Sequence, residues 1–336
     1  MAGIPEEEPY LSCVMPREAL KHEFLLDGVF AVAALDIARS SEEPDATKYE
    51  HIALEYYNRG SATFRALLAD IPPDTYHLMF IFAAAAAVVV LGLPQGTGDS
   101  KDEMTAVGRI ITLADLFSGA LLIVHAGWDK LTDAPYPFRE ALSVKVNSPG
   151  ILDANCPVER EGLPYRLASL DLLDDEIKTA LARLDSVNDE LHGPRQAVGV
   201  GEHAAEGDAR SVHEMYRLAI FWLKENFAER AVKGYFLSFF SLAGQDFAGA
   251  MKNAEPVALF ILLHWAVELD AAGKDLWWAK GLGRQLVIEV SDILQSSQLV
   301  LMPDGRDGIA WAQDCGNGRN DKDNTIHPAN HVTSDH

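Results

Sequence analysis

Apolar residues recur at helical spacing along most of the chain, and short polar or proline-rich segments interrupt them. Side chains at positions i, i+3, i+4 and i+7 share one face of a helix, so this spacing predicts amphipathic or buried helices. The predicted helices cover residues 16–40, 46–71, 74–93, 103–125, 164–191, 209–227, 228–243, 255–271 and 276–294. No segment shows the alternation of a β-strand, so we expect an all-α fold.

Two long breaks and the two ends of the chain define its organisation. Residues 132–162 contain four prolines and residues 192–208 are rich in glycine and polar groups, so both are predicted as loops. We find no repeat of 20 to 50 residues, which argues against a regular solenoid. The pattern predicts an N-terminal segment over 1–15, one domain over 16–315 with about eight to ten helices in an irregular bundle, and a disordered tail over 316–336.

The net charge restricts the classes of partner. The chain has 28 Lys and Arg against 50 Asp and Glu, a formal charge of −22. Such a chain repels nucleic acid phosphates and anionic membranes, so we expect no direct nucleic acid partner. Its hydrophobic content of 48% is enough for a sizeable core.

Cysteine usage and the N-terminus bear on localisation. Three distant cysteines, Cys13, Cys156 and Cys315, fit a reducing compartment better than a disulfide framework. The acidic start MAGIPEEEPY does not resemble a secretory signal. The uncharged run 78–93 is short for a membrane span and is predicted to be a buried core helix. We therefore expect a cytoplasmic protein with no membrane span.

Most motifs of common enzyme classes are absent from the sequence. HExxH, CxxC and GxSxG do not occur, and AVGVGEH has no preceding strand, so it is read as a flexible loop and not as a dinucleotide site. The segment DLLDDE places Asp171, Asp174 and Asp175 where they could hold magnesium and a diphosphate. The nearest second motif, Asp208, Ser211 and Glu214, has its last spacing one residue short, which rotates a ligand by about 100 degrees. A solvated acidic face is the preferred interpretation, and no metal or cofactor is expected.

Histidines in apolar helices and clustered aromatic residues are the candidate site residues. His264 and His125 are usually satisfied core histidines at such positions, but a pocket histidine can act as an acid or base near neutral pH. Glu268, one turn after His264, could pair with it. The predicted catalytic residues are therefore His264, Glu268 and His125. Aromatic residues that could line an apolar cavity are Phe30, Phe80, Phe82, Trp128, Trp265, Trp277 and Trp278.

Four segments in order resemble the effector domain of fungal binuclear-zinc-cluster transcription factors, in the branch that includes the sterol-uptake control regulators. They are PREALKHEFLLDGVFAVAALDIA, YEHIALEYYNRGSATFRALL, LADLFSGALLIVHAGWDKL and AEPVALFILLHWAVELDAAGKDLWWAKGLGRQLVIEV. The resemblance implies an all-α fold with a central apolar pocket, which in sterol-sensing members accepts a lipid. The family's six closely spaced cysteines are absent here, so DNA binding by that device is not expected.

The resemblance and the missing zinc cluster leave two functions open. The first is a protein of a fungal secondary-metabolite pathway that binds a terpenoid, sterol or polyketide and promotes its cyclisation, as a pericyclase or Diels–Alderase does. Such an enzyme needs few catalytic side chains, because holding the substrate in a reactive conformation lowers the barrier. The second is a ligand-sensing regulatory protein, nuclear in that case, without its own DNA reader. Two further alternatives are that the chain is a truncated gene product that only dimerises with full-length relatives, or that it forms a homodimer.

Overall fold

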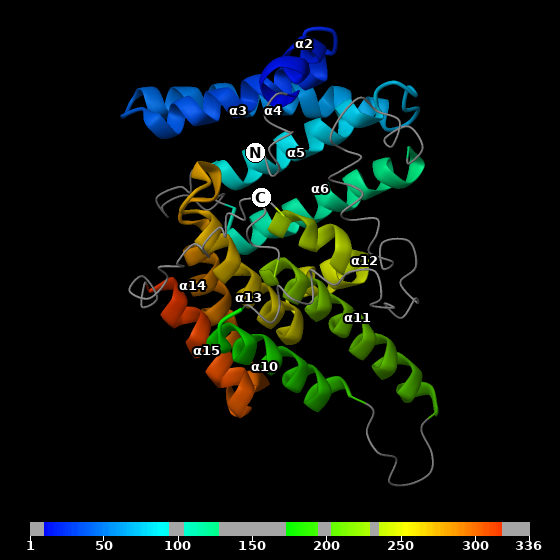
Figure 1. Cartoon of the computed structure of the whole chain (residues 1–336), viewed down its shortest axis with the longest axis vertical. Helices are drawn as coiled ribbons and strands as arrows, with labels where there is room; N and C mark the ends of the chain where they lie inside the picture. Colours follow the sequence, from blue (N-terminus) through cyan, green and yellow to red (C-terminus); the bar gives the residue numbers. More distant parts are fainter. Residues whose placement is uncertain (1–9, 94–103, 128–172, 194–202, 229–234, 318–336) are drawn as a thin grey trace, which may run out of the picture.

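The fold is that of a computed structural model of the chain, in which residues 10–93, 104–127, 173–193, 203–228 and 235–317 are described. These residues form eleven α-helices and no strand, so the predicted all-α class is confirmed. Figure 1 shows a layer formed by the N-terminal helices stacked on a bundle formed by the C-terminal ones. The helices are α2 (Met15–Ala19), α3 (Glu23–Ser40), α4 (Asp45–Leu67), α5 (Tyr76–Gly92), α6 (Ala106–Ala126), α10 (Asp175–His192), α11 (His203–Ala228), α12 (Phe239–Lys252), α13 (Pro256–Ala272), α14 (Leu282–Leu294) and α15 (Pro303–Gly316).

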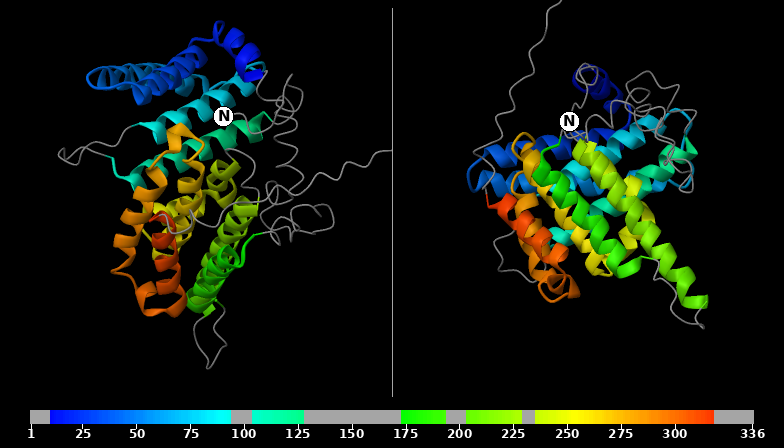
Figure 2. Two further views of the ribbon diagram at one scale, coloured as in Figure 1. Left: turned by 60° about the vertical axis from the view of Figure 1, so that its left-hand side comes forward. Right: turned by 60° about the horizontal axis from the view of Figure 1, so that its bottom comes forward.

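The N-terminal layer is an antiparallel pair, α3 and α4, packed on α5 (Figure 2). Phe82 of α5 lies beneath this pair and stacks on Phe64 at 5.0 Å between ring centroids. A Cβ at Gly60 would stand 2.8 Å from the Phe82 ring, so glycine is what permits this close approach. Across the pair, Arg59 donates two hydrogen bonds to the buried carboxylate of Asp27, at 2.8 and 2.5 Å.

Helix α13 is the centre of the C-terminal bundle. It begins with Pro256, which suits a first helical position, and it is apolar on all sides, as expected of a helix enclosed by others. It packs against α10, α11, α12, α14 and α15. Helix α14 approaches it at Gly283, where a Cβ would lie 2.2 Å from the backbone nitrogen of Asp270.

Several predicted boundaries differ from the structure. The segment predicted as one helix over 16–40 is broken at His22, whose extended backbone precedes α3. The segment over 276–294 is a 3-10 turn, Trp277–Ala279, followed by α14, because Gly281 adopts the left-handed φ of 80° between them. Helix α11 begins at His203, inside the loop predicted over 192–208. Helix α15 was not predicted at all.

Some predicted segments lie outside the described residues, and the predictions about membrane spans concern α5 and α6. The predicted loop over 132–162, the predicted tail beyond residue 317 and most of the N-terminal segment lie outside the described residues. Helix α5, which contains the uncharged run, is mostly buried, as predicted. Helix α6 is the one described helix long and apolar enough to cross a membrane, and this is weak evidence because core helices of soluble proteins meet the same criterion.

Candidate functional site

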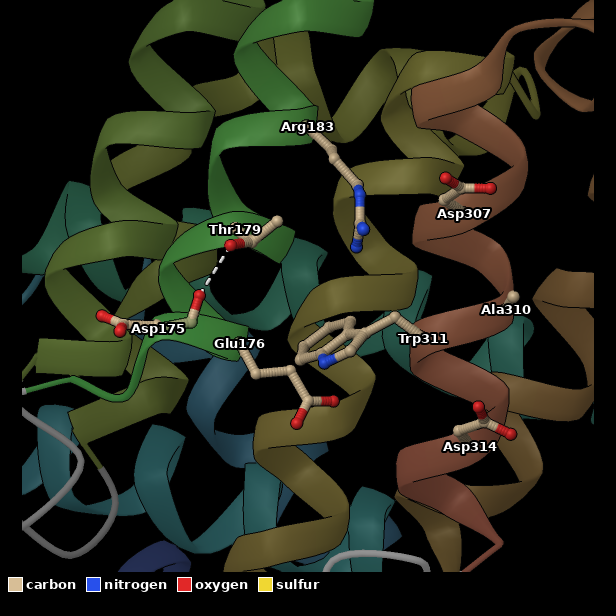
Figure 3. Close-up of a pocket in the computed structure, with 8 residues that line it drawn as sticks. All are labelled: Asp175, Glu176, Thr179, Arg183, Asp307, Ala310, Trp311 and Asp314. Atoms are coloured by element: carbon tan, nitrogen blue, oxygen red, sulfur yellow. Dashed lines mark hydrogen bonds between the residues drawn. The ribbon is translucent and has the colours of Figure 1, made fainter.

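An open cleft of about 540 Å³ lies between α10 and α15. The two helices run antiparallel, since Ser186 donates a 2.5 Å hydrogen bond to Asp304 at one end of the contact while Asp314 and Glu176 line the cleft at the other. Its lining consists of Asp175, Glu176, Thr179, Arg183, Asp307, Ala310, Trp311 and Asp314 (Figure 3). A volume in this range suits a small organic molecule.

Trp311 forms the floor of the cleft. Figure 3 shows its indole lying across the space between the helices, with the ring nitrogen on the side of Glu176 and with Arg183 reaching down from α10 above it. The side chain is 6% exposed, and its Nε1 has no hydrogen-bond acceptor among the described residues. Leaving a buried donor unsatisfied costs about 1–3 kcal/mol, and Trp nitrogens usually find a partner when buried. The floor of the cleft therefore contains a donor in need of an acceptor.

His264 lies behind this floor. Its imidazole stacks on the indole of Trp311, with 5.2 Å between ring centroids and 25° between planes. The Nδ1 atom is 2.9 Å from the carbonyl oxygen of Phe260. A carbonyl only accepts, so Nδ1 carries the proton and Nε2 presents a lone pair, which has no donor among the described residues.

The environment of His264 keeps its ring neutral. Its side chain is fully buried, and this burial lowers its pKa to about 4; the charge of Arg183 lowers the pKa further, while the bond to Phe260 opposes the shift. A ring that binds its proton only near pH 4 is a poor general acid at neutral pH, and here Trp311 separates it from the cleft. In the structure His264 packs against the rings of Phe260 and Trp311.

The predicted pairing of His264 with Glu268 is not formed. Glu268 lies one turn further along α13 and is 6% exposed, but neither imidazole nitrogen makes a hydrogen bond to it. The physical reason is that a neutral histidine in a helix satisfies Nδ1 with the carbonyl four residues earlier.

The other predicted catalytic residue, His125, lies in the last turn of α6, and its side chain is outside the described residues.

The predicted pocket aromatics do not converge on one chamber. Phe82 is buried in the N-terminal layer, whereas Phe30 is 42% exposed on α3 and packs on Tyr56. Trp265 is enclosed in the bundle, where its Nε1 donates to the carbonyl of Phe236 at 3.0 Å. Trp278 also packs on Phe236, Trp277 is partly buried beneath α3 and α5, and Phe80 is partly buried on α5. Trp128 lies outside the described residues.

The structure therefore does not contain the central apolar pocket that was expected, as far as the described residues go. Aromatic rings fill the space around Trp265 themselves, with Phe240 at 4.7 Å and Phe236 at 5.9 Å between centroids. Close packing of this kind leaves few voids in a protein interior. Among the described residues, the open cleft beside Trp311 is a concave feature that could hold a ligand.

The acidic motif has a structural explanation at its described positions. Asp174 is the N-cap of α10 and accepts a 2.9 Å hydrogen bond from the backbone of Ile177. Asp175 pairs with Lys178 at 3.6 Å. Asp171 and the side chain of Asp208 lie outside the described residues, and in the rest no group of three His, Cys, Asp or Glu is placed to hold a metal ion. Capping and the helix dipole account for these acids.

Sequence reasoning missed Trp311 and Arg183. The signal for α15 was present: Pro303 at its start and apolar or small residues at positions 305, 308, 309 and 312, which share one face. Three glycines in this helix lower its helical propensity and obscured the pattern. Arg183 lies on a predicted helix, but its position opposite Trp311 depends on tertiary packing.

No family model, curated protein or solved structure matches this chain.

Proposed function

We propose that this chain is a binding protein for a small organic molecule, which occupies the cleft between α10 and α15. The observation that carries the proposal is the buried indole N–H of Trp311, which has no acceptor among the described residues and faces the space between the two helices. A ligand with a carbonyl or similar oxygen would supply the acceptor. Its apolar body would contact the indole and the small side chain of Ala310.

A ligand can reach the indole N–H of Trp311 if one exposed side chain moves. Glu176 lies next to the indole nitrogen in Figure 3, and its side chain is exposed. An exposed glutamate changes rotamer at small cost, so a ligand can displace it and reach Nε1. The restored hydrogen bond would add about 1 kcal/mol or more to the binding free energy.

Of the two functions that the sequence left open, the geometry favours ligand sensing over cyclisation. The cleft is open along one side, and the histidine proposed for acid–base chemistry is neutral and separated from it by Trp311. A regulatory protein requires only that ligand binding changes the packing of two helices. Here the ligand would contact α10 and α15 together, and α15 in turn packs on the central helix α13.

The test is to identify small molecules that co-purify with the protein. Substituting Ala310→Phe fills the cleft with a side chain, and Ala182→Phe places the same ring on an exposed position of α10 outside the cleft lining. We expect mass spectrometry to find the same compound in wild type and Ala182→Phe, and to find it depleted in Ala310→Phe. A compound retained equally by Ala310→Phe, or no retained compound in the wild type, contradicts the proposal.

The same material tests cyclisation. A pericyclic reaction converts its substrate to an isomer of equal mass. If a compound extracted from the protein, or its uncyclised precursor, is converted by wild type to a product of the same mass and different retention time, and Ala310→Phe loses this activity, the cyclase function is supported. Binding without conversion supports the sensing function.

A further inference from the structure

Arg183 is a second hydrogen-bond donor in the cleft, in addition to the indole of Trp311. It lines the cleft from α10, and it forms no hydrogen bond or ion pair among the described residues. Figure 3 shows its guanidinium reaching toward the indole from the side opposite the ring nitrogen. Its charge also lowers the pKa of His264, which stacks on the indole, and this agrees with a guanidinium near that ring.

The two donors require acceptors at two places. The Nε1 atom of Trp311 has no acceptor among the described residues, although its side chain is only 6% exposed. The guanidinium of Arg183 carries five N–H groups and no acceptor of its own. Because the donors lie on different sides of the indole in Figure 3, one oxygen atom does not serve both. A ligand that satisfies the cleft therefore carries two acceptors.

Most carboxylates of the lining already take part in an interaction. Asp175 lies 3.6 Å from Lys178, and Asp307 lies 3.4 Å from Arg306 on the exposed surface of α15. Asp314 also has an interaction of its own. The charge that a ligand meets therefore depends mainly on the two other ionic groups of the lining.

These two groups, Glu176 and Arg183, oppose each other. They carry opposite unit charges, both line the cleft from α10, and Glu176 likewise forms no hydrogen bond or ion pair among the described residues. Neither side chain is buried, so each attracts or repels a charged ligand only weakly. A ligand carboxylate would be attracted by Arg183 and repelled by Glu176. Hydrogen bonds, and not net charge, therefore decide which ligand binds.

We infer that the ligand is a neutral, ring-containing carbonyl compound with two oxygen acceptors, such as a diketone, an imide or a lactone. One oxygen would accept from the indole N–H of Trp311 and the other from the guanidinium of Arg183. The ring would lie against the indole and Ala310. Arg183 then determines specificity, because it distinguishes a compound with two acceptors from a compound with one. The inference rests on the proposed function for the existence of the site.

Three bicyclic probes of similar shape separate these properties. N-methylphthalimide is neutral with two carbonyls, N-methylisoindolinone is neutral with one, and indane-2-carboxylate is an anion. Protein labelled with ¹⁵N at tryptophan gives one indole signal per tryptophan, and Trp311→Phe identifies the signal of Trp311. Dissociation constants follow from the shift of this signal during titration. We expect N-methylphthalimide to bind about fivefold more tightly than N-methylisoindolinone, and indane-2-carboxylate to bind no more tightly than N-methylisoindolinone.

Matched variants locate the preference. Arg183→Met should remove the difference between the two neutral probes, whereas Arg217→Met, the same change at an exposed position of α11 outside the cleft lining, should retain it. Glu176→Gln should tighten the binding of indane-2-carboxylate by about threefold and leave the neutral probes unchanged, because only the anion is repelled by Glu176. Glu190→Gln, an equal charge change at an exposed position of α10, should affect none of the probes.

The inference and the proposed function can fail separately. Equal affinity of the two neutral probes, a difference between them that persists in Arg183→Met, or tightest binding of the anion by wild type overturns the inference. Each of these results leaves the binding function standing, because the probe still shifts the Trp311 signal. If none of the probes shifts this signal, both are refuted.

Discussion

The buried imidazole of His264 makes the stability of this fold depend on pH in a way that one substitution can isolate. The ring is enclosed between Phe260 and Trp311, and its folded pKa is about 4 against an ordinary value of 6.5. Below pH 6.5 the unfolded chain binds a proton at this residue that the folded chain does not bind. The free energy of unfolding therefore falls as the pH is lowered from about 6.5 to about 4, and this loss stops below pH 4.

The size of the effect follows from the two pKa values. A difference of about 2.5 units corresponds to about 3 kcal/mol when the whole interval is crossed. Between pH 7.5 and pH 5 the loss at this residue is about 2 kcal/mol, since part of the interval remains. Other residues also titrate in this range, so the quantity to measure is the difference between wild type and a variant that lacks the imidazole.

His264→Leu replaces the ring with an apolar side chain that does not titrate. Urea denaturation followed by circular dichroism gives the free energy of unfolding of both proteins at pH 7.5 and pH 5. We expect wild type to lose about 2 kcal/mol more than the variant between these two values. His51→Leu, at an exposed position of α4, is the control and should follow wild type. Equal losses in wild type and His264→Leu would refute the reasoning.

Three further substitutions test the packing and hydrogen bonding of the bundle by urea denaturation. Gly308→Ala places a Cβ 2.4 Å from Cζ of Phe260 and should destabilise the protein by about 1–3 kcal/mol; an unchanged midpoint would mean that α15 does not lie so close to α13. Tyr216→Phe removes a 2.6 Å hydrogen bond to Glu255 and should cost about 2 kcal/mol, and a neutral effect would show that this bond is not formed. Gly281→Ala forces a side chain into a left-handed backbone at φ 80° and should cost about 1 kcal/mol, whereas Gly281→Asn, which tolerates this region better, should cost less; equal costs would contradict the strain explanation.

The helices that sequence patterns predicted best are those that the structure encloses most. Helix α13 was predicted almost to the residue, because it is apolar on every side and begins at Pro256. Its enclosure in the bundle follows from the same property. The breaks at His22 and Gly281 were not predicted, since each depends on one backbone conformation within an otherwise continuous apolar pattern.

The candidate site was harder to predict for a physical reason. Periodicity shows that Trp265 lies on a buried face but cannot show whether the space beside it is empty or filled by Phe236 and Phe240. The cleft depends on α15, a helix whose glycines weaken its sequence signal, and on the pairing of α15 with α10 across more than a hundred residues. His264 was predicted as a catalytic residue from its position in an apolar helix, but the sequence could not show that Trp311 stands between it and the cleft.

The most direct test of the ligand site is to ask which tryptophan responds when the cleft is occupied. Trp311 and Trp222 are both buried with an indole nitrogen that has no acceptor in the part of the chain described, but only Trp311 lines the cleft. In protein labelled with ¹⁵N at tryptophan, the co-purified compound, added back to protein from which it was removed, should move the indole signal of Trp311 downfield as its N–H gains an acceptor, and should leave Trp222 unmoved. A response at Trp222 with none at Trp311 would place the ligand elsewhere and contradict the site.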